Sequence, residues 1–87
     1  MKIVEKKIWP KFFKLVQSRK KNVETRLADF KISPGDVLVL REWDPKKKRY
    51  TGRSLRRTVR GVNRTYAHVI YPPAKIKKYG LMTIELK

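Results

Sequence analysis

Lys21, Glu24 and Arg26 form the sharpest chemical grouping in the sequence. Residues 22–27 alternate as in a β-strand, so Glu24 and Arg26 share one face of the strand whereas Thr25 takes the other. A carboxylate can accept hydrogen bonds from a base edge or a sugar hydroxyl, and neighbouring cations can hold phosphate. An internal salt bridge at a helix-to-strand corner would use the same residues. The sequence leaves both interpretations open.

Many of the other cationic residues lie in a predicted loop and in the strand that follows it. In that strand Arg56 and Arg60 share a face about 13 Å apart, at about 3.3 Å per residue, so a nucleic-acid backbone could follow them. Arginine also offers a planar fork to phosphate and can stack on bases. A solvated sheet face is the alternative, but few acidic residues interrupt the run. The residues predicted to bind nucleic acid are Lys20, Lys21, Glu24, Arg26, Lys46, Lys47, Lys48, Arg49, Tyr50, Arg53, Arg56, Arg57, Arg60 and Arg64.

Exposed aromatic rings would complete a surface for single-stranded nucleic acid, because each ring can stack a base for about 1–3 kcal/mol. The candidates are Trp43, Tyr50, Tyr66, Tyr71 and Tyr79. In so small a domain most of these rings should lie in the core. We expect one or two beside the basic surface, and their neighbours in sequence favour Tyr50 and Tyr66.

The whole chain is strongly basic: its 87 residues carry 24 Lys and Arg against 7 Asp and Glu, a formal charge of +17. Like charges repel in a compact domain, so this imbalance favours a polyanionic partner. Thermophile surfaces usually balance their cations with glutamate, and solubility needs a net charge of only about 2–8. We therefore expect a nucleic acid as the partner.

Other classes of site find little support in the sequence. The absence of cysteine excludes disulfides and thiolate metal sites, and His68 is the only histidine. The carboxylates lack metal-ligand spacing and the glycines form no phosphate-binding loop, so we expect no metal and no cofactor. No apolar run is long enough for a signal peptide or a membrane span. These features predict a soluble, cytoplasmic protein that does not engage membranes.

The hydrophobic pattern predicts a single domain over residues 1–87, mainly β with one or two short helices. Pro10 suits the first position of a helix, and the residues after it favour an amphipathic helix over residues 11–20 with its apolar face in the core. A polar hairpin loop is predicted over residues 44–52. So many short strands favour a small barrel, which leaves no exposed strand edge. The predicted strands cover residues 3–9, 22–27, 37–43, 54–62, 66–71 and 81–86.

Three segments carry a likeness to a known family. They read SRKKNVETR over residues 18–26, PGDVLVLREWDP over residues 34–45 and YTGR over residues 50–53. In order and spacing they resemble the ASCH superfamily, most closely its small DUF3850 group. The likeness covers roughly residues 6–71, and Arg19 stands where the group usually has glycine.

This resemblance implies a PUA-like fold, a small β-barrel with a helix at its mouth. It also implies a cleft between the helix and the barrel, lined by Lys21, Glu24 and Arg26. The role proposed for such domains is RNA binding or RNA metabolism. The chain is therefore predicted to be a small RNA-binding domain that uses this cleft and the basic surface, with RNA favoured over DNA.

Two other functions remain as alternatives. Some relatives in the superfamily are amidohydrolases that remove the acetyl group from acetylated cytidine with a Lys, a Thr and a Glu. Lys21 matches the Lys, but Glu24 stands at the Thr position and residues 67–71 contain no acid; a hydrolase would thus depend on Lys21 and Glu24. A module that docks acidic proteins is the third class, and it predicts an exposed apolar patch beside the basic surface.

Overall fold

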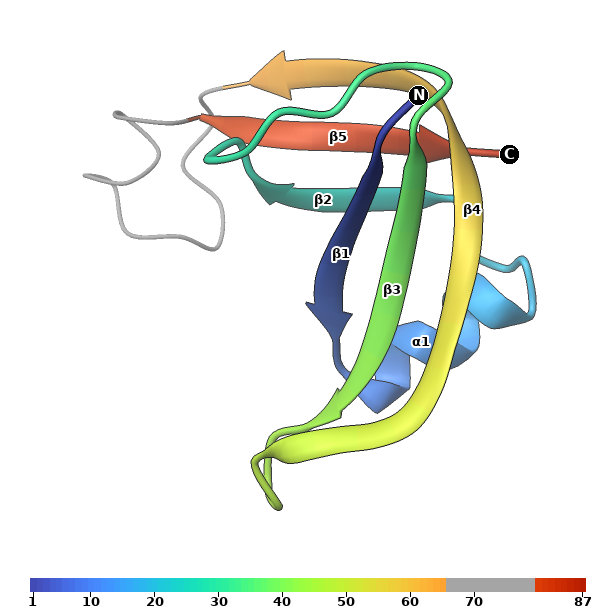
Figure 1. The fold of residues 1–87 in the computed structure, drawn as a ribbon, viewed down its shortest axis with the longest axis vertical. Helices are drawn as coiled ribbons and strands as arrows, with labels where there is room; N and C mark the ends of the chain where they lie inside the picture. The colour runs from blue at the N-terminus through green and yellow to red at the C-terminus, as the bar shows by residue number, and fades with distance from the viewer. Residues whose placement is uncertain (66–79) are drawn as a thin grey trace.

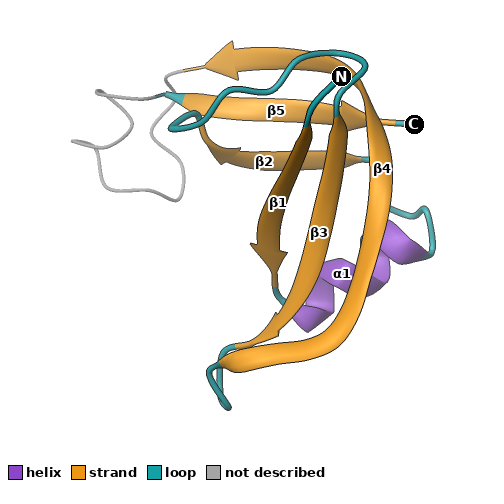
Figure 2. Ribbon diagram, viewed as in Figure 1, coloured by secondary structure: helices purple, strands orange, loops and turns teal. Residues whose placement is uncertain are grey.

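The computed structural model describes residues 1–65 and 80–87, which form one mixed sheet and one short helix. The elements are β1 (Ile3–Ile8), α1 (Pro10–Gln17), β2 (Val23–Leu27), β3 (Val37–Asp44), β4 (Arg49–Thr65) and β5 (Leu81–Leu86) (Figure 1). The prediction of a mainly β domain with a short helix is confirmed (Figure 2). The strand predicted over residues 66–71, and the aromatic candidates Tyr66, Tyr71 and Tyr79, lie outside the described residues.

The strands follow the order β1-β3-β4-β5-β2. β1 runs parallel to β3, and all other neighbours in the sheet are antiparallel. β4 pairs with β3 through its first part and with β5 through its last part, so the sheet curves round into two halves (Figure 1). Within the described residues β1 and β2 remain as two unpaired edges, and closure into the expected PUA-like barrel is not confirmed.

A β-bulge marks the point at which β4 changes partner. Thr58 still pairs with Val37 of β3, whereas Val59 pairs with Leu86 of β5. The register shifts immediately afterwards, between Val59 and Gly61. An extra residue in one strand bends that strand and increases its twist, so this bulge helps to turn the sheet between its two halves.

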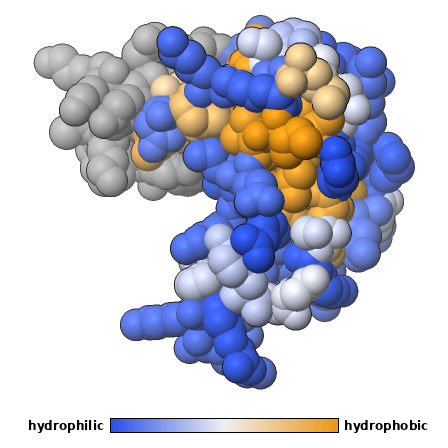
Figure 3. Space-filling view, viewed as in Figure 1, coloured by the Kyte–Doolittle hydropathy of each residue, from blue (hydrophilic) through white to orange (hydrophobic). Residues whose placement is uncertain are grey.

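The core lies inside the curve of the sheet and against α1. Phe13 and Val16 of α1 are 1% and 0% exposed, and each fully buried side chain of this size contributes about 1.5–3 kcal/mol. β5 presents its alternate residues to the core as predicted. Hydrophilic residues cover most of the face seen in Figure 3, around a hydrophobic area near its middle. The buried cluster contains Ile8, Phe13, Val16, Ala28, Ile32, Leu38, Leu40, Val59, Met82, Ile84 and Leu86.

Helix α1 is shorter than the sequence predicted. Pro10 occupies the start of the helix as expected, but the helix ends at Gln17 because Arg19 adopts a left-handed conformation with φ of 62°. Phe12 belongs to the apolar residues that were expected to face the core, but it is 39% exposed. Among the described residues there is no helix long and apolar enough to cross a membrane.

The hairpin between β3 and β4 is tighter than the predicted loop over residues 44–52. Trp43 pairs with Tyr50 and Asp44 with Arg49, so the turn itself comprises only residues 45–48. The Asp44 carboxylate accepts hydrogen bonds from the backbone N–H groups that follow it, which closes the turn and lowers the pKa of Asp44. The polar composition of the segment indicated a loop, but cross-strand pairing extends β4 back into it.

Arg57 lies in the interior rather than on the predicted binding surface. It is 8% exposed, and its guanidinium donates to the Val16 carbonyl, the Asn22 side-chain oxygen and the Lys87 carbonyl. Val16 lies in the last turn of α1, where carbonyls lack partners within the helix and a cation is favourable. Burial lowers the pKa of Arg57, and the nearby charge of Arg19 lowers it further. Arg57 thus ties the end of α1 to the C-terminal strand.

Replacing Arg19 with glycine is expected to stabilise the domain. A left-handed conformation costs a residue with a side chain about 1–2 kcal/mol, and glycine avoids this cost. The greater freedom of glycine in the unfolded chain offsets about 0.4–1 kcal/mol of the resulting stabilisation. The Arg19→Gly variant should therefore melt a few degrees higher, at about 4–8 °C per kcal/mol. Arg19→Ala is the matched control, because it also removes the charge near Arg57 but keeps the backbone strain. Equal melting temperatures for the two variants would contradict this explanation.

Candidate functional site

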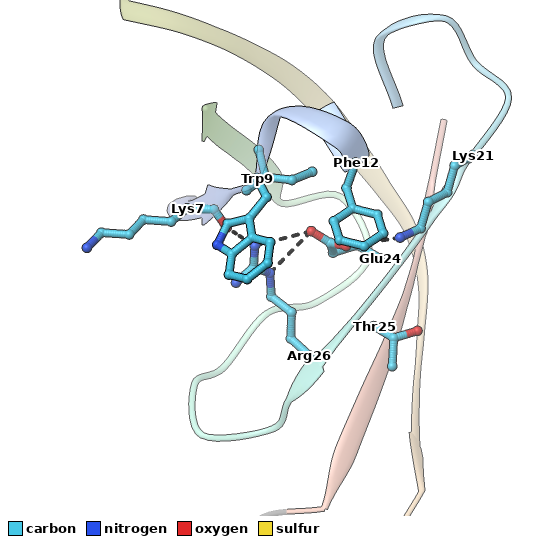
Figure 4. Close-up of a pocket in the computed structure, with 8 residues that line it drawn as sticks. Lys7, Trp9, Phe12, Lys21, Glu24, Thr25 and Arg26 are labelled. Carbon is cyan, nitrogen blue, oxygen red and sulfur yellow. Dashed lines mark hydrogen bonds and ion pairs between the residues drawn. The ribbon is translucent and has the colours of Figure 1, made fainter. Parts of the chain in front are cut away.

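A cleft lies between α1 and the two sheet edges formed by β1 and β2. Its volume is about 620 Å³. The chain enters α1 directly from the end of β1, and β2 begins a few residues after α1, so three consecutive elements supply the walls. The cleft is lined by Lys7, Ile8, Trp9, Phe12, Lys21, Glu24, Thr25 and Arg26 (Figure 4).

Glu24 is the buried charge of this cleft, at 5% exposure. One carboxylate oxygen lies 3.7 Å from the Lys21 ammonium, and the other lies 3.2 Å from Arg26 Nη2 and 3.3 Å from Arg26 Nε. A buried carboxylate is costly unless it is paired with a cation and hydrogen-bonded. The three residues singled out in the sequence are thus brought together, and the same ion pairs that fix the corner also line the cleft.

Arg26 also joins the two edges of the sheet. Its Nη2 donates a hydrogen bond to the backbone carbonyl of Lys7 in β1, while its own backbone belongs to β2. β1 and β2 do not pair with each other in the described part of the chain, so a side chain crosses the gap that strand pairing leaves open. The Arg26 side chain remains 22% exposed, so it is not closed off from the cleft.

Two aromatic rings that the sequence analysis did not assign to the site stand at the mouth of the cleft. Trp9 is 56% exposed and Phe12 is 39% exposed. Lys21 Nζ lies 4.9 Å from the centroid of the Phe12 ring, a cation–π contact. Helical geometry could have indicated the position of Phe12. Phe13 and Val16 fill the inward face of α1, and Phe12 is rotated about 100° from Phe13 around the helix axis.

Thr25 lines the cleft near its edge but is directed away from the Glu24 carboxylate (Figure 4). This agrees with the predicted alternation, which placed Thr25 and Glu24 on opposite faces of the strand. Lys21 and Glu24 therefore approach each other without the Thr25 hydroxyl. Among residues 1–65 and 80–87, no group of His, Cys, Asp and Glu side chains is arranged to hold a metal ion.

Arg53, another predicted binding residue, is engaged by a second buried carboxylate. Glu42 is 2% exposed and accepts hydrogen bonds from Arg53 Nε at 2.8 Å and Nη2 at 2.7 Å. The Thr51 hydroxyl donates to the same carboxylate at 2.7 Å. Two residues of the YTGR segment thus hold Glu42 of the preceding strand. The Arg53 side chain is still 50% exposed, so it forms part of the surface while serving a structural role.

The remaining predicted residues lie mostly at the surface, although not all of them adjoin the cleft. Tyr50 is 37% exposed, as expected, and Trp43 is partly buried against it with ring centroids 5.0 Å apart. The Arg64 backbone belongs to β4, but its side chain lies outside the described part of the structure. The exposed cations among these remaining predicted residues are Lys20, Lys46, Lys47, Lys48, Arg49, Arg56 and Arg60.

The Glu42 cluster predicts a specific pH dependence of stability. Hydrogen bonds from Arg53 and then Thr51 lower the pKa of Glu42 below its usual 4.5, against the opposing effect of burial. The ionised group therefore stabilises the fold above about pH 4.5, and this contribution disappears as the pH falls through the lowered value. The Glu42→Gln variant should melt several degrees below the wild type at pH 7, and the gap should narrow at pH 3.

Glu5→Gln, which changes an exposed glutamate, serves as the matched control and should melt with the wild type at pH 7. Differential scanning calorimetry at the two pH values measures both gaps. An unchanged gap for Glu42→Gln at pH 3 would show that the Glu42 charge does not stabilise the fold.

Comparison with known proteins places the chain in a family and supports its fold. No curated protein matches the sequence. The crystal structure of hypothetical protein PH0355 is similar, with a TM-score of 0.75, 21% sequence identity, and coverage of 100% of this chain and 98% of that one. At that identity the likeness concerns the fold alone. The family model described as "Domain of unknown function (DUF3850)" matches residues 3–72. The chain therefore belongs to the DUF3850 family.

Proposed function

We propose that this protein is a small RNA-binding domain, related to the PUA-like ASCH domains, that holds RNA in the cleft beside α1 and on the adjoining basic surface. The observation that carries the proposal is the composition of the cleft. Exposed rings of Trp9 and Phe12 stand beside Lys21 and Arg26. Stackable rings next to cations are the two components that single-stranded nucleic acids require.

The charge of the whole chain supports the same proposal. A formal charge of +17 creates a long-range field that attracts polyanions and accelerates their association. Within the cleft, both oxygens of the buried Glu24 carboxylate contact cations, so Glu24 holds the charges of Lys21 and Arg26 in place. The cations that hold Glu24 in place are then also available to phosphate.

Hydrolysis of acetylated cytidine or a related nucleoside is the alternative function. Lys21 Nζ lies 3.7 Å from Glu24 in a cavity of about 620 Å³, large enough for a nucleoside. Thr25 is directed away from this pair, however, and both Glu24 oxygens already contact cations. Release of acetate from acetylated cytidine by the wild type, lost in Lys21→Ala, would favour this function over RNA binding.

Binding of labelled single-stranded RNA should fall steeply with salt. If about four phosphates are neutralised, a log–log plot of affinity against salt concentration should have a slope of about −3. Fluorescence anisotropy across a salt series measures the slope, with single-stranded DNA and duplex RNA of the same sequence as competitors. RNA should compete better than either. No binding near physiological salt would refute the proposal, and equal competition by all three would reduce it to a generic basic surface.

Removing the Trp9 ring should weaken RNA binding without unfolding the domain. Trp9 is 56% exposed, so Trp9→Ala costs little core burial, whereas loss of one stacked base costs about 1–3 kcal/mol, or about fivefold to 150-fold in affinity. Trp9→Phe keeps a ring and is the matched control. If Trp9→Ala binds as tightly as Trp9→Phe, the cleft is not where bases stack.

A further inference from the structure

Three pockets adjoin one another around the β1 edge of the sheet. The cleft and a second pocket of about 380 Å³ share Lys7 and Arg26 in their walls. The second pocket shares Tyr50 with a third, of about 310 Å³, at the β3–β4 hairpin. The three pockets therefore form one path from the cleft to the hairpin, which we call the track.

Cations and aromatic rings are interleaved in the middle of the track. The Arg41 guanidinium lies 3.9 Å from the centroid of the Tyr50 ring, and Lys7 Nζ lies 3.9 Å from that of the Trp43 ring. Strand register produces this arrangement, because Lys7 pairs with Arg41 and Trp43 pairs with Tyr50. The Lys7 side chain extends away from Glu24, out of the cleft (Figure 4). Residues from three strands thus meet on one side of the sheet.

Positive charge exceeds negative charge along the whole track. The cleft is lined by three cationic residues and one carboxylate, Glu24. The second pocket is lined by four cationic residues, two of them shared with the cleft, and one carboxylate, Glu5. In the third pocket Lys47 and Arg49 outnumber Asp44, whose carboxylate already accepts two backbone hydrogen bonds. A polyanion therefore meets a net attraction in each pocket.

We propose that the track holds one single strand of RNA across the sheet. Bases stack at the Trp9 and Phe12 rings at one end and on Tyr50 at the other, while Lys7, Arg26 and Arg41 hold the intervening phosphates. This inference rests on the proposed function and deepens it. It also differs from the path of the nucleic acid that the sequence favoured. The RNA strand crosses β1, β3 and β4 instead of following Arg56 and Arg60 along β4.

The spacing of exposed rings favours a single strand over a duplex. Bases in a duplex are stacked on each other and do not offer their faces, whereas unpaired bases can splay onto separate rings. Trp9, Phe12 and Tyr50 are all more than one third exposed. An acidic peptide would satisfy the cations, but its carboxylates would leave these rings without a partner.

The length of RNA required provides the test. Single-stranded RNAs of two, four and eight nucleotides are titrated against the wild type, Tyr50→Ala and Tyr50→Phe. Tyr50→Ala should weaken the eight-nucleotide RNA about fivefold or more but leave the two-nucleotide RNA, which only fills the cleft, unchanged. Tyr50→Phe keeps the ring and should bind all lengths like the wild type.

Arg41→Ala should show the same length dependence, and it keeps the test informative if Tyr50→Ala proves poorly folded by circular dichroism. Arg60→Ala is the matched control for Arg41→Ala, because it removes the same charge from β4. Arg41 pairs with Ser54 of β4, and Arg60 lies six residues further along that strand. At about 3.3 Å per residue, Ser54 and Arg60 are roughly 20 Å apart along the strand. Its effect should be small and equal at all lengths.

The outcomes separate the two proposals. Absence of wild-type binding at every length overturns both the RNA-binding function and the track. If Tyr50→Ala and Arg41→Ala weaken the binding of eight nucleotides no more than the binding of two, the track alone is overturned. A larger length-dependent loss in Arg60→Ala would restore the route along β4. Displacement of the RNA by an equal concentration of octaglutamate would assign the surface to acidic proteins.

Discussion

The double pairing of β4 is the constraint on which the rest of the structure depends. One strand of 17 residues serves as the partner of β3 in its first part and of β5 in its last part. Because the strand bends between these parts, the outer neighbours β1 and β2 are carried toward each other from opposite ends of the strand order. The cleft is the space between these two edges and α1, so its position follows from the curvature of β4.

Charged side chains, some buried and some partly exposed, then hold this arrangement of the described strands in place. Arg26 spans the gap between β1 and β2, Arg57 ties the end of α1 to the C-terminal strand, and Glu42 anchors the start of β4 through Arg53. In a protein of 87 residues the apolar core is small, so directed interactions of this kind have a large share in fixing the geometry. Each of them leaves one cation partly or wholly committed to structure, which reduces the surface available for binding.

The basic residues do not all contribute to binding in the same way, so the net charge alone does not locate the binding surface. A formal charge of +17 indicates a polyanionic partner for the chain as a whole. A buried guanidinium such as that of Arg57 adds to the positive electrostatic field but does not contact such a partner. Conversely, strand register places Lys7 and Arg41 beside Trp43 and Tyr50. These two cations lie outside the basic segment over residues 46–64. The candidate binding surface is therefore defined by where cations meet exposed rings, not by their density in the sequence.

The sequence by itself determined the mainly β class, the position of the helix start at Pro10, and the two faces of β2 that set Glu24 and Arg26 against Thr25. These features depend on local rules, namely the two-residue period of a strand and the fixed φ of proline, and local rules are visible in a single segment. The likeness to the DUF3850 group, over roughly residues 6–71, also came from the sequence, and the family match over residues 3–72 bears it out.

Only the tertiary structure decided the length of β4, the burial of Arg57 and the exposure of Trp9 and Phe12. It also decided that β1 and β2 do not pair with each other within the described residues. Each of these depends on a partner outside the segment itself: Tyr50 pairs with Trp43 across the hairpin, and Arg57 donates to Val16 across 41 residues. A residue pattern reports which face is apolar, but not which surface that face meets. Contacts between distant segments set the burial of each side chain, and burial separates the cations that support the fold from those left free to bind.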